Sequence, residues 1–82
     1  MNTRSTTRIR YLGLFPVEMK RLRRGELVTV AVVAGVAHAL EVGDRLTGTC
    51  DLERVEVEVV AKHPEPDAPH ISADIDLRQV TE

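Results

Sequence analysis

Cations are the residues of this chain best suited to chemistry. Residues 1–24 carry seven lysines and arginines against one acid, whereas residues 25–82 carry four against twelve acids. Guanidinium and ammonium groups at this density bind phosphate, so the division predicts a basic surface for RNA or another polyanion on an acidic body. The candidate contacts are Arg8, Arg10, Lys20, Arg21, Arg23 and Arg24.

Two other interpretations of these cations stay open. Four cations between Lys20 and Arg24 also suit a helix face that is simply solvated. Alternatively, they pair with acids of the same chain, for which Glu56 and Glu58 are the candidates. With two aromatic residues in the whole chain, base stacking is disfavoured, and we expect phosphate contacts to dominate any binding.

One short segment combines the side chains that ligate metals. Residues 63–70 contain two imidazoles and two carboxylates, together with three prolines. No helical spacing places the two histidines on one face, so we interpret the segment as a solvated, extended loop and expect neither a metal nor another cofactor. The metal candidates in it are His63, Glu65, Asp67 and His70.

Nucleophilic catalysis is not indicated. A nucleophile needs a positioned base beside it, and Cys50, Ser72 and His38 are scattered without a local pattern. We expect Cys50 to act as a small buried hydrophobe. As the single cysteine, it excludes an internal disulfide and a zinc ribbon.

The elements that must position the cations begin with one short helix. Pro16 suits a first helical turn, and Gly25 suits a helix end. Phe15, Met19 and Leu22 repeat at helical spacing, which predicts one apolar stripe against the core. The cations occupy the remaining surface, so the basic charge is concentrated on one helix.

The rest of the chain favours strands. Residues 8–14 predict a first strand, and the nearly continuous apolar run 26–34 predicts a strand buried on both faces. The connection 35–40 is expected to hold at most one helical turn, and Val42-Gly43-Asp44 predicts a tight turn. Further strands are expected over residues 45–50, 53–61 and 71–78.

These elements predict a mainly β fold, a β-dominated α+β domain. We expect a flexible tail over residues 1–7 and a single small barrel over residues 8–82. The barrel would have five to six strands, with one short helix after the first strand.

The order of elements resembles the ASCH family of PUA-like β-barrels. The resemblance spans about residues 9–62 and rests on the helix from Phe15, on Gly25, and on Gly43-Asp44 before a barrel strand. It implies an RNA or nucleotide-like ligand between helix and barrel, with Gly25, Gly43 and Asp44 as structural positions. Leu27 stands where the family has a lysine. The position of the family's downstream arginine falls among Val30, Ala31 and Val32. ASCH-type hydrolase activity is therefore not carried over.

Three segments of the chain also resemble a second family. Residues 27–33, 42–46 and 73–77 resemble the β-barrel of domain 2 in elongation factor Tu-like proteins. That resemblance would make residues 16–24 irregular or extended. We prefer the helix because Pro16, the apolar stripe and Gly25 agree with one another.

The sequence therefore predicts a non-enzymatic domain that binds RNA or another polyanion. The alternative is a protein-interaction or assembly module, such as a small accessory or phage-type protein, whose valine-rich strands pair with a partner or a second copy. No stretch approaches the length needed to span a bilayer, and no signal-type segment begins the chain. We expect a cytoplasmic protein without a membrane partner.

Overall fold

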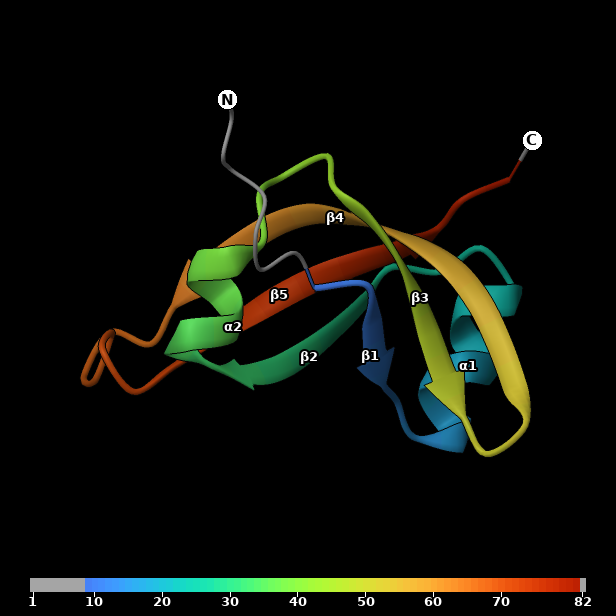
Figure 1. The fold of residues 1–82 in the computed structure, drawn as a ribbon, viewed down its shortest axis with the longest axis horizontal. Helices are drawn as coiled ribbons and strands as arrows, with labels where there is room; N and C mark the ends of the chain where they lie inside the picture. Colours follow the sequence, from blue (N-terminus) through green and yellow to red (C-terminus); the bar gives the residue numbers. More distant parts are fainter. Residues whose placement is uncertain (1–8, 82) are drawn as a thin grey trace, which may run out of the picture.

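The computed structural model describes residues 9–81, so the expected tail over residues 1–7 lies outside the described residues. Five strands and two helices follow one another along the chain (Figure 1). No helix among the described residues is long and apolar enough to cross a membrane. The elements are β1 (Tyr11–Gly13), α1 (Pro16–Arg23), β2 (Val28–Val33), α2 (Ala34–Ala39), β3 (Arg45–Cys50), β4 (Glu53–Pro64) and β5 (Ser72–Gln79).

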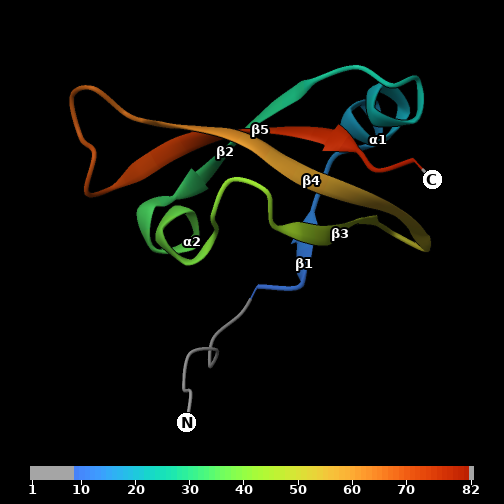
Figure 2. The same cartoon turned by 90° about the horizontal axis from the view of Figure 1, so that it is seen from above.

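The strands form one sheet in the order β1-β3-β4-β5-β2. The pair β1–β3 is parallel, and the other three pairs are antiparallel. The sheet curls into a half-barrel, and α1 and α2 lie near its opposite ends (Figures 1 and 2). A small β-dominated fold is thereby confirmed, with β1 and β2 as its two edges.

The core fills the inner side of the curled sheet and is entirely aliphatic or thioether. The strict alternation predicted for β4 is confirmed, because its inward valines are buried and its outward Arg54 and Glu56 are exposed. The fully buried residues are Met19, Leu22, Leu40, Ile75, Leu77, Val28, Val57 and Val59.

Two expectations about burial were wrong. The strand at residues 26–34 was expected to be buried on both faces, but β2 is an edge strand with Thr29, Ala31 and Val33 exposed. Phe15 was placed in the apolar stripe, yet it is 71% exposed, while Met19 and Leu22 are buried. Phe15 precedes the helix in an extended conformation, so its ring does not follow the helical periodicity.

The predicted turn at Val42-Gly43-Asp44 is present. The Asp44 N–H donates to the Glu41 carbonyl at 3.0 Å, and the Glu41 N–H donates to Asp44 Oδ2 at 3.0 Å. Gly43 takes a φ of +100°, which the third residue of such a turn requires and glycine adopts without strain. The turn directs the chain into β3, so Arg45 immediately follows it.

The connection after β2 differs from the prediction. Residues 34–39 form the helix α2, where the sequence predicted a connection and a barrel with one helix. Two carbonyl groups at its C-terminal end accept hydrogen bonds from Lys62 of β4, whose Nζ donates to Ala37 O and Leu40 O. That partner lies more than twenty residues away in the sequence, so local periodicity did not reveal it.

The loop at residues 63–70 is also shorter than expected. His63 and Pro64 belong to β4 and pair with Asp74 and Ala73 of β5, although the sequence predicted a loop without ladder bonds. Turn bonds close the remainder, since the Ile71 N–H donates to Ala68 O at 3.0 Å. The proline ends the strand pairing instead of preventing it.

Candidate anion-binding surface

Helix α1 is fixed at its start by a backbone-to-side-chain contact. The Phe15 N–H donates to Glu18 Oε1 at 2.9 Å, and Pro16 occupies the first helical turn. Glu18 thereby satisfies an N–H group that the helix cannot pair itself, near the positive end of the helix dipole. The predicted start of the helix is confirmed.

The end of α1 is fixed by glycine. Gly25 has a φ of +85°, and its N–H donates to Leu22 O at 2.9 Å. The Glu26 N–H donates to Arg21 O at 3.1 Å, which completes a Schellman motif. Because this motif turns the chain back, Glu26 lies beside the last turn of the helix that it follows.

The four predicted cations, three on α1 and Arg24 directly after it, all lie exposed, whereas Met19 and Leu22 of the same helix are buried. The Arg21 Nε donates to Glu26 Oε1 at 2.8 Å, and Arg24 Nη1 lies 3.5 Å from Glu26 Oε2. The hydrogen bond from Arg21, with the positive charge of both arginines, lowers the pKa of Glu26. Two of the three guanidinium groups therefore share one carboxylate.

The third arginine of α1 reaches another element. Arg23 Nη1 donates to Glu53 Oε1 of β4 at 2.7 Å. Within residues 9–81, no ion pair involves Lys20. Pairing within the chain thus occurs, but with Glu26 and Glu53, whereas the sequence offered Glu56 and Glu58 as partners.

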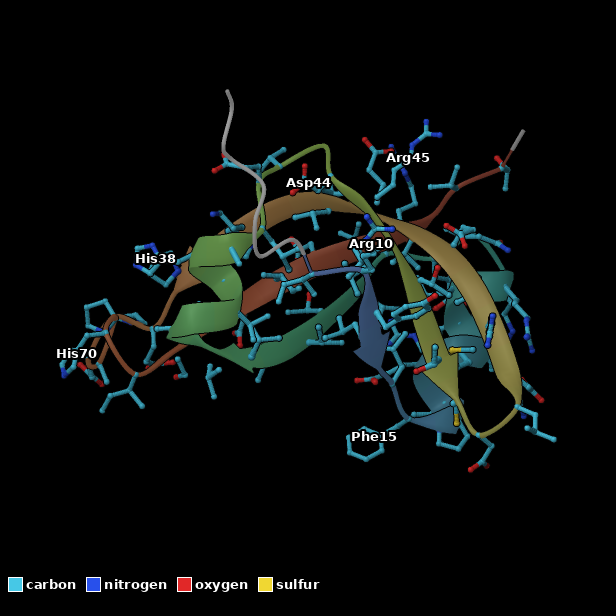
Figure 3. All side chains as sticks on the ribbon, in the orientation of Figure 1. Arg10, Phe15, His38, Asp44, Arg45 and His70 are labelled. Carbon is cyan, nitrogen blue, oxygen red and sulfur yellow. The ribbon has the colours of Figure 1, made fainter. Side chains whose placement is uncertain are left out.

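The two remaining predicted cations are Arg8 and Arg10. Arg8 falls outside the described residues, and Arg10 is exposed just before β1. Arg10 lines a hollow of about 400 Å³ together with Tyr11, Arg45 and Glu56. Arg10 and Arg45 belong to segments far apart in the sequence, and Figure 3 shows them close together beside Asp44. The hollow is separate from the cations of α1.

A second hollow adjoins the first at Arg45. It has a volume of about 390 Å³ and extends to Glu58, Arg78 and Gly25. Glu58 stands directly opposite Arg45 on β3 and opposite Arg78 on β5. Because Gly25 ends α1, the two hollows lead from Arg10 toward the C-terminal end of the basic helix.

The metal candidates of residues 63–70 are not brought together. Among the described residues, no group of three or more His, Cys, Asp or Glu side chains is arranged to hold a metal ion. His63 instead directs its Nε2 to Asp76 Oδ2 of β5 at 2.9 Å, while His70 lies at the tip of the loop (Figure 3). The strand pairing of His63 removes it from the loop that carries Glu65 and Asp67.

Asp76 has a second partner on β2. The Thr29 hydroxyl donates to Asp76 Oδ1 at 2.6 Å. This hydrogen bond, followed by the contact with His63, lowers the pKa of Asp76. The carboxylate accepts from Thr29 of β2 and from His63 of β4, so it links both neighbouring strands to β5.

Cys50 is packed against the core and does not resemble a catalytic thiol. Desolvation by burial, with smaller effects from Asp51 and Glu53, raises the pKa of the Cys50 thiol. A raised pKa reduces the thiolate that nucleophilic attack requires.

Comparison with family models, with curated proteins and with solved structures gives no match to this chain. Sequence reasoning missed Tyr11, Arg45 and Glu56 as a group, because they meet only through the β1–β3–β4 register. The one local signal was the Gly43-Asp44 turn, which places Arg45 at the start of β3.

Proposed function

We propose that this chain is a non-enzymatic binding domain that contacts RNA or another polyanion through the exposed face of α1. The observation that carries the proposal is the placement of four exposed cations on one short helix and its C-cap residue, while Met19 and Leu22 of the helix are buried in the core. Burial of Met19 and Leu22 fixes which side of α1 faces the solvent. The proposal agrees with the ASCH resemblance drawn from the sequence.

The ion pairs of α1 are exposed and weak enough for a polyanion to replace them. The side chains of Arg21, Arg23 and Arg24 keep about half or more of their surface exposed in those pairs. Pairs of this kind contribute little net stability, so phosphate oxygens can replace the carboxylates as partners. Lys20 offers an ammonium group directly. Such contacts favour affinity over sequence specificity.

Titration of a labelled single-stranded RNA at several salt concentrations tests the proposal. Affinity should fall steeply with salt, and a variant with glutamine at Lys20, Arg21, Arg23 and Arg24 should lose binding while remaining folded. Glutamine preserves helix propensity, so the change removes charge and little else.

A matched control separates a helix site from net charge. Replacing Lys20 and Arg23 by glutamine removes two charges from α1, whereas replacing Arg54 and Arg78 removes two from the outer face of β4 and β5. The first pair should weaken binding far more than the second. Unchanged RNA affinity in the fourfold variant would refute the proposal.

A second candidate function is favoured by the free edge of β2. Ala34 N–H donates to Ile71 O at 2.9 Å, so in the alternating ladder the backbone groups of Thr29 and Ala31 point away from β5. No other strand of the described chain pairs with β2 on that side. The strand carries neither charge nor proline, the features that usually block edge pairing.

We propose that this edge pairs with the same edge of a second copy. In an antiparallel pairing centred on Ala31, Thr29 lies opposite the second copy's Val33, which is 62% exposed in the single chain. Sedimentation over a wide concentration range tests it, with Ala31→Pro as the variant that removes an edge N–H without removing a bond to β5. A wild-type chain that stays monomeric throughout would contradict this assembly function.

A further inference from the structure

The hollow between β1 and β3 combines basic, acidic and aromatic side chains, unlike the group of cations on α1. It is lined by Arg10 and Tyr11 on one side, by residues 44–47 on another, and by Glu56 of β4. Its volume, about 400 Å³, is that of a small-ligand site. Three segments distant in the sequence build it, and each contributes a polar or aromatic group.

Two guanidinium groups of the hollow have no carboxylate partner within the described chain. Arg10 and Arg45 are both exposed, and neither takes part in an ion pair of residues 9–81. This distinguishes them from Arg21 and Arg23 of α1, which are paired. Arginine presents its N–H groups in a planar fork that matches phosphate oxygens, so a pair of such forks suits a phosphate ester.

Tyr11 adds an aromatic surface to the same hollow. It is the single tyrosine of the chain, and 61% of it is exposed although it belongs to a strand. In the sheet it stands beside Thr47, which in turn stands opposite Glu56. An exposed ring in a hollow that two arginines also line offers a surface on which nucleobases stack.

The acids of the hollow narrow the class of ligand. Asp44 Oδ2 accepts the Glu41 N–H, and Glu56 Oε2 accepts the Thr47 hydroxyl at 2.8 Å. Both carboxylates repel a ligand that is only anionic, which disfavours inorganic phosphate. A ligand that also carries hydrogen-bond donors, such as an amino group or sugar hydroxyls, can donate to the Glu56 carboxylate and is therefore favoured over an anion without donors.

We propose that this hollow binds a nucleotide, with its phosphate between Arg10 and Arg45, its base against the Tyr11 ring, and a base or sugar donor on Glu56. The site is independent of the polyanion surface on α1. The nucleotide can be free or part of a single-stranded RNA, since both present the same phosphate, sugar and base.

Tyr11 makes the proposal directly measurable. The chain has no tryptophan, so its fluorescence reports the environment of Tyr11 alone, and stacking of a base quenches it. Titration with adenosine 5′-monophosphate should give saturable quenching. Amide shifts of Tyr11 and Thr47 in nuclear magnetic resonance spectra should saturate at the same concentration. Inorganic phosphate should bind at least about tenfold more weakly.

Variants locate the site. Arg45→Ala should weaken adenosine monophosphate binding by about tenfold or more, and Arg10→Ala should weaken it similarly. The control is Arg54→Ala, an exposed arginine of β4 that lies outside the hollow and has no ion pair in the described chain. It should leave binding unchanged. Unchanged amide spectra away from the hollow show that each variant is folded.

The results distinguish a free nucleotide from a nucleotide within RNA, and they identify the failure of the proposal. A short oligoadenylate that quenches Tyr11 at a lower concentration than the mononucleotide does, with the quenching lost in Arg45→Ala, identifies a nucleotide within RNA. Tighter binding of the mononucleotide identifies a free nucleotide. Absence of saturable quenching, equal binding of inorganic phosphate, or an equal loss in Arg54→Ala would overturn the proposal. The RNA surface on α1 could still stand in each case.

Discussion

The ammonium group of Lys62 on β4 lies 2.6 Å from the carbonyl oxygen of Leu40, directly after the last residue of α2. The same group donates to Ala37 O at 3.0 Å. A six-residue helix forms few internal bonds, so this cation satisfies two carbonyl oxygens at the negative end of its dipole. The second helix therefore depends on a residue of the sheet.

We expect Lys62→Met to loosen α2. Methionine retains the apolar stem but donates no hydrogen bond, which should lower the free energy of unfolding by about 1–2 kcal/mol. Amide hydrogen exchange in residues 34–39 should accelerate more than exchange in β4. Lys20→Met is the control, since Lys20 is exposed and donates no bond in the described chain. Equal exchange of α2 in the wild type and Lys62→Met would contradict this role.

The dependence of α2 on Lys62 shows where sequence reasoning reaches its limit. Local signals sufficed for α1, because Pro16 and Gly25 mark its ends and Met19 and Leu22 mark its inner face. They sufficed for β4, whose alternation is strict. They did not suffice for α2, whose stabilising partner comes from a distant strand.

The same limit applies to the edges of the sheet and to the sites. Strand order places β2 at an edge of the sheet, and the side chains on its outer face stay exposed; the nearly continuous apolar run 26–34 encodes neither feature. The density of cations on α1 was evident from the sequence, but their partners were not. Glu26 meets Arg21 only because the glycine turn folds the chain back.

Gly48 of β3 lies close to a buried neighbour, so an added side-chain atom there would force that neighbour to shift. A Cβ there would lie 2.5 Å from Leu14 Cδ1 and 3.4 Å from Val55 Cγ1. Glycine to alanine in a strand otherwise favours folding, but here the buried Leu14 must move. We expect Gly48→Ala to lower the free energy of unfolding by about 1–3 kcal/mol. Urea denaturation measures this change.

Two further variants isolate the contact between Gly48 and Leu14. Gly13→Ala in β1 is the control, since a Cβ there meets nothing within 4 Å, and it should be neutral or slightly stabilising. Combining Leu14→Ala with Gly48→Ala should cost less than the sum of the two single changes. Additive losses would show that Leu14 does not restrict Gly48.

The contact between Thr29 and Asp76 predicts a pH-dependent stability difference. The hydrogen bond from Thr29, with a smaller effect from His63, lowers the pKa of Asp76 in the folded chain. The stabilisation is therefore fully present above the ordinary aspartate pKa, about 3.9, and is lost as the pH falls through the lower folded value. Thr29→Val removes the donor and keeps strand propensity.

We expect Thr29→Val to lower the free energy of unfolding by about 1 kcal/mol near neutral pH. The difference from the wild type should shrink as the pH is lowered through about 4 toward 2. Urea denaturation at several pH values measures it, and Thr49→Val, on β3, is the control. A difference that stays constant over this range would contradict the assigned cause.

Glu26 is the residue of this chain that competes most directly with a polyanion, because its carboxylate engages both Arg21 and Arg24. Glu26→Gln should release both guanidinium groups and raise the affinity of the chain for single-stranded RNA by about twofold to fivefold at low salt. The gain should disappear as salt is raised, since the released charges are exposed. Glu41→Gln removes the same charge before the β3 turn and should produce a smaller gain. Fluorescence anisotropy with a labelled RNA measures each affinity. An equal gain in both variants would show that RNA responds to net charge and not to the cations of α1.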